Sequence, residues 1–204
     1  QLAKKLNLRN TPELRFLVDN SIAYGNHMSK LIDEATKDLH PKTTYTYINV
    51  QGDEPIVEEI PIPAADIAAI EQFAREHFNS GWTPQMKIAY TFYWVHENMI
   101  YAYGGNVAPT FCVAAFQRRY GQCAQYNGSL VEMLCYYGYD AALIRGTRGS
   151  GAPGSQHFWG ELYLNGETYV IEVGNADSDG TWNYFFVPYE FTRKFIKCGE
   201  VMGK

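Results

Sequence analysis

Three segments of the chain carry a thiol, an imidazole and a carboxylate in the order that catalysis by a cysteine nucleophile requires. Cys123 lies in the segment YGQCAQY, His157 follows in QHFW, and Glu172 ends the segment TYVIE. In such a site the sulfur attacks a carbonyl carbon, the imidazole ionises the thiol, and the carboxylate orients the imidazole. We therefore take Cys123, His157 and Glu172 as the candidate catalytic residues.

The cysteine is expected in the first turn of a helix. Gly121 offers a break in the backbone, and apolar residues between 122 and 137 recur at helical spacing until Gly138 ends the pattern. The free amides and the positive dipole end at a helix start lower the pKa of a thiol, and the thiolate is the reactive form. Cys135 falls near the other end of this helix, so we interpret it as a packing residue.

A hairpin is expected to bring the histidine and the carboxylate together. Asn165 and Gly166 form the strongest short signal for a two-residue type I′ turn between two strand-like runs. Counting outward from this turn puts Trp159 opposite Glu172, so His157 and Glu172 share a face as diagonal neighbours. A slip of one residue would separate them, so the inference depends on the length of the turn.

These segments resemble the transglutaminase-like superfamily. In that family a glycine and a cysteine open a helix, a His followed by an aromatic residue lies on a strand, and an Asp lies on the next strand. The resemblance covers roughly residues 80 to 175, includes the helix-like run KIAYTFYWVHENMIYAYGG, and suggests a bacterial-type single-domain member. It implies Cys123 as the nucleophile and His157 as the base.

The third catalytic position departs from the family pattern, because Glu172 stands where the family usually has Asp. A Glu side chain is one methylene longer and can still accept a hydrogen bond from an imidazole N–H. Asn175 and Asp177 lie nearby in the sequence and stay open as alternatives for this position.

The resemblance implies cleavage or transfer at peptide or isopeptide amide bonds through a cysteinyl thioester, as in a cysteine protease, a deamidase or a transglutaminase. The partner would then be a peptide or protein substrate. An oxyanion hole would use the backbone N–H of Cys123 and one side-chain donor, for which Gln117 and Gln122 are both candidates. Two other readings stay open: acyl transfer to an arylamine, and a binding module on a catalytically idle fold.

Composition excludes several other classes of protein. The chain has 204 residues, 46% of them apolar, with 16 Tyr and 11 Phe, which is enough to bury a sizeable core. A net charge of −5 argues against nucleic acid as a partner. No window approaches the roughly 18 apolar residues of a membrane span. The sequence contains no CxxC or HxxxH pair, and we expect neither a metal nor a cofactor.

Four cysteines are too few for a disulfide scaffold in a chain of this length, although Cys112 and Cys198 could pair. The chain begins with Gln1 and shows no signal peptide, as expected for a processed mature form or an arbitrary boundary. An extracytoplasmic location therefore stays open.

The pattern along the chain predicts an α+β fold of the papain and transglutaminase-like kind, with the catalytic helix packed on an antiparallel sheet. We expect a mainly helical N-terminal extension with a short strand pair over residues 1–79 and the catalytic core over residues 80–204. The expected elements are helices within 11–39, at 65–78 and at 83–101, strands at 43–50 and 56–62, and a last strand with a short helix from 181 to 198.

Overall fold

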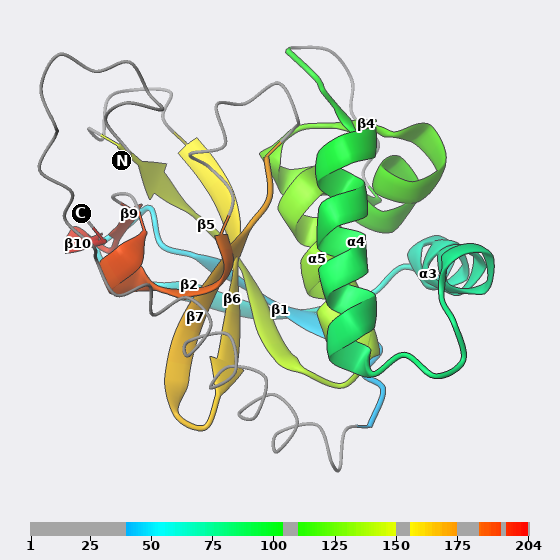
Figure 1. The fold of residues 1–204 in the computed structure, drawn as a ribbon. Coiled ribbons are helices and arrows are strands. Elements are labelled where there is room, and N and C mark those ends of the chain that lie inside the picture. Colours follow the sequence, from blue (N-terminus) through cyan, green and yellow to red (C-terminus); the bar gives the residue numbers. More distant parts are fainter. Residues whose placement is uncertain (1–39, 104–109, 150–155, 175–183, 193–194, 204) are drawn as a thin grey trace, which may run out of the picture. The chain divides into compact units, whose positions relative to one another are not determined.

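The computed structural model describes residues 40–103, 110–149, 156–174, 184–192 and 195–203 (Figure 1). The chain divides after Lys30 into two units, and every described residue belongs to the second one. The helices expected within residues 11–39 lie outside the described residues, as do Asn175 and Asp177.

An eight-stranded sheet runs through the described residues. Its antiparallel path is β10 (Glu200–Met202), β9 (Phe195–Lys197), β5 (Asp140–Arg148), β6 (Gln156–Leu164), β7 (Glu167–Glu172) and β8 (Tyr184–Pro188). β1 (Thr44–Asn49) pairs in parallel with β5 and antiparallel with β2 (Ile56–Pro61). Apart from this sheet, β3 (Ile100–Tyr101) and β4 (Tyr120–Gly121) form a short parallel pair.

The helical segments that precede β5 lie together on one side of this sheet, whereas the last one directly follows β8 and lies apart from them (Figure 1). They are α3 (Ala64–His77), α4 (Pro84–Asn98), the π-helix η1 (Val113–Arg118), α5 (Cys123–Tyr136) and the 3-10 helix η2 (Tyr189–Phe191). α5 packs against β5 and β6 and also contacts α4. The predicted α+β class, with a catalytic helix on a mainly antiparallel sheet, is therefore confirmed.

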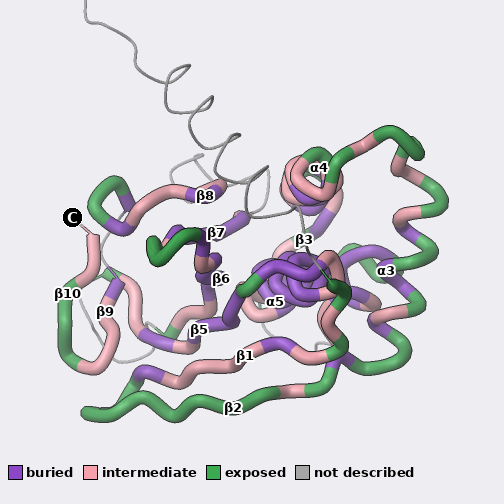
Figure 2. The backbone as a smooth tube through the Cα atoms, turned by 90° about the horizontal axis from the view of Figure 1, so that it is seen from below, coloured by how far each residue is buried: buried purple, intermediate pink, exposed green. Residues whose placement is uncertain are grey.

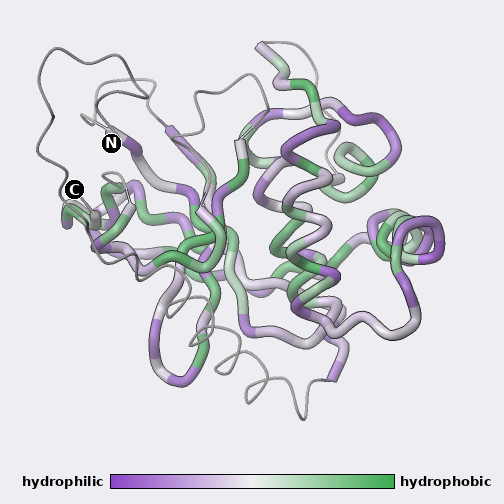
Figure 3. Tube along the Cα trace, in the orientation of Figure 1, coloured by the Kyte–Doolittle hydropathy of each residue, from purple (hydrophilic) through white to green (hydrophobic). Residues whose placement is uncertain are grey.

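α5 begins and ends where its sequence predicts. Gln122 caps its start, and the side chains of Gln122 and Gln125 form a reciprocal capping box that satisfies two backbone amides. Gly138 follows its end with φ of 91°, a conformation that glycine adopts without strain. Residues 125–135 are all buried, so α5 forms the centre of the core (Figure 2), and apolar residues recur along α5 and β5 (Figure 3).

The hairpin between β6 and β7 has the predicted register. Leu164 pairs with Glu167 across a two-residue turn in which Asn165 and Gly166 have φ of 53° and 82°. Both angles are positive, as a type I′ turn requires. Because Gly160 pairs with Ile171 one step further in, the same count puts position 159 opposite position 172.

The structure corrects the end of one expected helix and adds a partner to the expected strand pair. The helix expected to reach Tyr101 ends at Asn98, because Ile100 and Tyr101 pair with β4 instead. The strand pair expected in the N-terminal extension belongs to the main sheet, since β1 pairs with β5. The division between residues 79 and 80 stays a prediction. Backbone hydrogen bonds cross it, from the N–H of Lys42 to the oxygen of Cys135 (3.1 Å) and from the N–H of Trp82 to the oxygen of Asn79 (3.1 Å).

Among the residues that the structure describes, no helix is both long and apolar enough to cross a membrane.

Buried carboxylates satisfy the first backbone amides of the helical segment that begins at Phe111. Asp66 accepts hydrogen bonds from the backbone N–H groups of Phe111 (3.2 Å) and Val113 (2.7 Å). Glu132 faces the thiol and the backbone N–H of Cys112. Burial, with a further contribution from the charge of Asp66, raises the pKa of Glu132 from 4.5 to about 8. Glu132 therefore keeps its proton at neutral pH in the folded protein.

This buried proton makes stability depend on pH. The unfolded chain loses the proton of Glu132 near pH 4.5 and the folded chain near pH 8, so the stability associated with this group is full below 4.5 and falls between these values. We expect Glu132→Gln to raise the melting temperature at pH 8, by about 2 to 4 °C for each kcal/mol gained, and to have little effect at pH 4.5. Thermal unfolding across this range, with the exposed Glu58→Gln as control, measures the effect. An equal shift at both pH values would contradict the assignment.

Candidate active site

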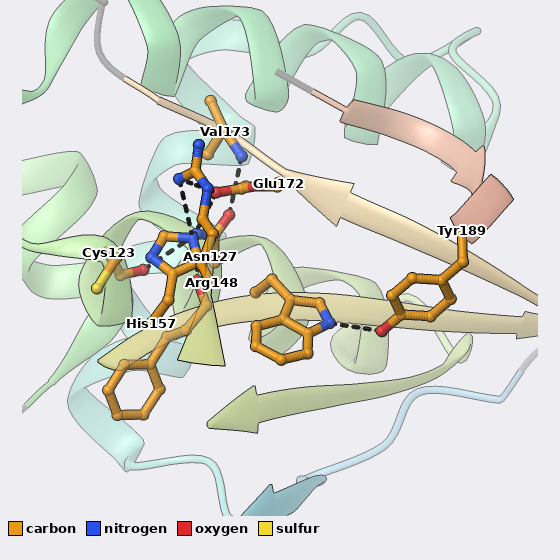
Figure 4. A network of polar contacts seen from close by, with 9 residues as sticks. Cys123, Asn127, Arg148, His157, Glu172, Val173 and Tyr189 are labelled. Atoms are coloured by element: carbon orange, nitrogen blue, oxygen red, sulfur yellow. Dashed lines mark hydrogen bonds and ion pairs between the residues drawn. The ribbon is translucent and has the colours of Figure 1, made fainter. Parts of the chain in front are cut away.

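Cys123 is the first residue of α5, so its side chain lies beside the backbone amides that open the helix (Figure 4). The thiol is partly buried. The backbone N–H of Phe158, the imidazole of His157 and the hydroxyl of Tyr101 all lie close to its sulfur and lower the pKa of the thiol. Three separate segments, α5, β6 and β3, thus meet at the thiol.

Asn127 connects the first turn of α5 to the two strands that carry the other candidate residues. Its side-chain N–H groups donate to the carbonyl oxygens of Phe158 (2.9 Å) and Cys123 (3.2 Å), and its side-chain oxygen accepts from the N–H of Val173 (2.8 Å). The side chain is buried, and each of these bonds is to backbone. Asn127 was not among the site residues predicted from the sequence, although its position, a polar residue one turn after Cys123 on the inward face, was a signal for it.

His157 and Glu172 form a direct hydrogen bond, from imidazole Nε2 to the Oε1 atom of the carboxylate (Figure 4). Glu172 is buried, and His157 is mostly so. With Nε2 bonded to Glu172, the other ring nitrogen, Nδ1, is left for the thiol. The structure thus places the His157 imidazole against the Glu172 carboxylate and beside the Cys123 thiol.

The electrostatics of the pair favour a thiolate and an imidazolium. Burial on its own raises the pKa of the Cys123 thiol, but the hydrogen bond and charge of His157 outweigh it, so the pKa is lowered from 9.0. Burial likewise lowers the pKa of His157, but the hydrogen bonds and charges of Cys123 and Glu172 raise it to about 9. Each partner stabilises the charged form of the other.

Tyr101 is a site residue that our sequence analysis did not identify. Tyr101 pairs with Gly121 in the parallel β3–β4 ladder, the Ala102 N–H donates to the Gly121 oxygen at 2.8 Å, and the Gln122 side chain donates to the Ala102 oxygen at 3.2 Å. Burial, then the charge of Cys123, raises the pKa of Tyr101 to about 12, so its hydroxyl remains a donor. No local sequence pattern predicts the parallel pairing between β3 and β4, which lie about twenty residues apart in the chain.

The two glutamines considered as oxyanion donors lie differently. Gln117 is exposed on η1. Gln122 caps α5, and its side-chain amide donates to the carbonyl of Ala102. The exposure of Gln117 and the bond from Gln122 to Ala102 both favour an oxyanion role less than the position of the Tyr101 hydroxyl beside the thiol does.

The other cysteines differ from Cys123 in their surroundings. Cys112 and Cys135 are buried, and burial raises the pKa of both thiols, that of Cys135 to about 12. Cys198 is partly buried, and all four cysteines are free, so Cys112 and Cys198 form no disulfide. Cys135 therefore matches its interpretation as a packing residue.

The chain was compared with known proteins. A family model described as the transglutaminase-like superfamily matches residues 71–174, which are 104 of the 204 residues. Among solved structures, the periplasmic domain of TgpA from Pseudomonas aeruginosa is 20% identical over 53% of this chain and 42% of that chain, with a TM-score of 0.41. A candidate cysteine protease from Cytophaga hutchinsonii is 16% identical over 54% of this chain and 42% of that chain, with a TM-score of 0.40.

Among curated proteins, short matches lead to ribosome-binding factor A. The protein of Lachnospira eligens is 68% identical over 37 residues, which are 18% of this chain and 28% of that protein. The protein of Agathobacter rectalis is 63% identical over 38 residues, which are 19% of this chain and 31% of that protein. The chain thus spans under a third of the length of these two relatives. The family model, by contrast, matches more than half of the chain and includes all three candidate catalytic residues, and the chain belongs to the transglutaminase-like superfamily.

Proposed function

We propose that this protein cleaves or transfers acyl groups at peptide or isopeptide amide bonds through a thioester on Cys123. One observation carries the proposal: the thiol with the lowered pKa lies at the start of α5 beside an imidazole that a buried carboxylate holds by a hydrogen bond. Nucleophile, base and orienting acid are the parts that this chemistry needs. The substrate would be a peptide or protein, and the catalytic core would lie within residues 80–204, which contain every residue of the site.

In the first half-reaction, the Cys123 thiolate attacks the carbonyl carbon of the amide and a carbon–sulfur bond forms. The carbonyl electron pair moves to oxygen, which becomes an oxyanion. His157 then gives its Nδ1 proton to the amide nitrogen, the carbon–nitrogen bond breaks, and the amine leaves. The acyl group remains as a thioester and His157 is left neutral.

In the second half-reaction, neutral His157 takes a proton from water or from an amine while that acceptor attacks the thioester carbon. The carbon–sulfur bond breaks and its electron pair returns to sulfur, so the thiolate and the imidazolium are restored. Water yields a carboxylic acid and gives hydrolysis, whereas an amine yields a new amide and gives transfer. Which acceptor reaches the site decides between these outcomes.

The oxyanion needs two hydrogen-bond donors. The backbone N–H of Cys123 is free of an intrahelical partner because it opens α5. The hydroxyl of Tyr101 lies beside the Cys123 sulfur and keeps its proton, so it is our proposed second donor. This assignment replaces Gln117 and Gln122.

The first prediction concerns thiol reactivity. Iodoacetamide should label Cys123 faster than Cys112 or Cys135 at pH 7, because the pKa of Cys123 is lowered and theirs are raised. His157→Gln removes the counter-charge and should slow labelling about tenfold for each unit by which the thiol pKa rises. Peptide mapping by mass spectrometry gives the rates, and Cys198→Ser is the control. Equal labelling of all cysteines would remove the nucleophile assignment.

The second prediction concerns Tyr101. Tyr101→Phe should lower kcat by roughly 10² to 10³, the usual loss for one oxyanion donor, while Cys123 stays reactive toward iodoacetamide. Tyr103→Phe, an exposed aromatic residue two positions away, is the matched control and should keep full turnover. If Tyr101→Phe turns over normally, the second donor is another group.

The third prediction separates the possible reactions. Glutamine-containing peptides and isopeptide-linked peptides are offered with and without a primary amine, and the products are identified by mass spectrometry. Release of ammonia or amine should occur, should persist with a chelator because His157 ionises the thiol, and should vanish in Cys123→Ala. Incorporation of the amine marks transfer, and its absence marks hydrolysis. Turnover that survives Cys123→Ala would refute the thioester mechanism.

A further inference from the structure

Arg148 lies against the carboxylate and imidazole of the proposed site. Its Nη1 atom is 3.0 Å from Oε1 of Glu172 and 3.5 Å from Nε2 of His157 (Figure 4). Its side chain is 16% exposed and that of Glu172 is 2% exposed, so solvent screens the three charges only weakly. Our sequence analysis did not identify this residue.

Strand register explains why Arg148 reaches the site. β5 pairs with β6 so that Gly146 lies opposite His157, and residues two apart on a strand share a face. Arg148 is therefore a diagonal neighbour of His157 on β5, just as Glu172 is on β7. The histidine is thus flanked by a cation on one strand and an anion on the other.

Arg148 and His157 share one acceptor atom. The Oε1 atom of Glu172 takes a hydrogen bond from Nη1 of Arg148 and another from Nε2 of His157. A guanidinium keeps its charge at every working pH, so it neutralises much of the carboxylate's pull on the imidazole. It also repels an imidazolium directly at 3.5 Å.

We propose that Arg148 is a positioning residue that keeps the His157 imidazolium acidic enough to give up its proton, by sharing the Glu172 carboxylate with it. The proposal rests on the proposed function, since only there does His157 have to protonate a leaving amine. Among the residues that the structure describes, three charged or titratable groups face His157: Cys123 from α5, Glu172 from β7 and Arg148 from β5. Of these, only Arg148 opposes the charged imidazole.

The chemical consequence lies in the first half-reaction. A carboxylate that bonded only to His157 would hold the Nδ1 proton more tightly and would slow cleavage of the carbon–nitrogen bond. Arg148 weakens that hold while the carboxylate still orients the ring. This arrangement fits the presence of Glu at position 172, where the family usually has Asp. The extra methylene of Glu172 extends the carboxylate toward both Arg148 and His157.

The experiment measures the titration of the His157 ring by NMR, assigned by loss of its signals in His157→Gln. Arg148→Met should move this titration to higher pH by about one unit, a tenfold stronger hold on the proton, and should lower kcat on an amide substrate. Arg148→Lys keeps the charge, so its kcat and the proton affinity of its His157 should stay within about threefold of those of the unchanged protein. Arg145→Met, on the same strand but bonded to Gln156, is the matched control and should shift nothing.

A double-variant cycle tests whether Arg148 acts through Glu172. In the Glu172→Gln background, Arg148→Met should change the proton affinity of His157 by less than about threefold. The shared acceptor is then neutral, and only the direct repulsion at 3.5 Å remains. This double variant removes both charges of the buried pair and so avoids leaving one unpaired if Arg148→Met folds poorly.

Several results would overturn the inference: no shift in Arg148→Met, a shift to lower pH, or a full shift that persists without the Glu172 charge. If His157→Gln leaves the labelling of Cys123 unchanged, the proposed function falls as well. If that variant stops labelling while Arg148→Met does nothing, only the role of Arg148 falls.

Discussion

The site depends on the three hydrogen bonds of Asn127. This buried side chain ties the first turn of α5 to the backbone of β6 next to His157 and to the backbone just after β7. A helix and a hairpin could each fold correctly and still leave the thiol several ångströms from the imidazole. Because a buried amide side chain left without partners costs free energy, these bonds select the one docking that satisfies all of them.

Charge balance is the second condition of the site. The proposed thiolate and the Glu172 carboxylate are countered by the His157 imidazolium and the Arg148 guanidinium, so positive and negative groups alternate. Buried charges persist only when they are paired. This balance lets a reactive thiolate exist in a mostly buried place, and it ties the protonation of each group to that of its neighbour.

Beside the site, a cluster of buried aromatic residues packs on the same face of the strand that carries His157. Trp159 is fully buried, packs on Phe195 at 4.7 Å between ring centroids, and donates its indole N–H to the hydroxyl of Tyr189 at 2.6 Å. Trp159 lies on β6 like His157, and Figure 4 shows the hydrogen bond that its indole makes with Tyr189. The His157 ring lies 6.4 Å from Trp159 and 6.5 Å from Phe195 between centroids, so this packing supports the position of the imidazole.

The sequence by itself determined the local parts: the start of α5 at Cys123, and the two-residue turn that puts His157 and Glu172 on one face. Capping residues and a turn dipeptide act on their own neighbours, which is why such signals can be read directly. Only the tertiary structure decided that Tyr101 and Arg148 join them and which backbone groups Asn127 binds. Their places depend on the β3–β4 and β5–β6 pairings and on how α5 docks, which result from burying apolar surface across distant segments rather than from any short pattern.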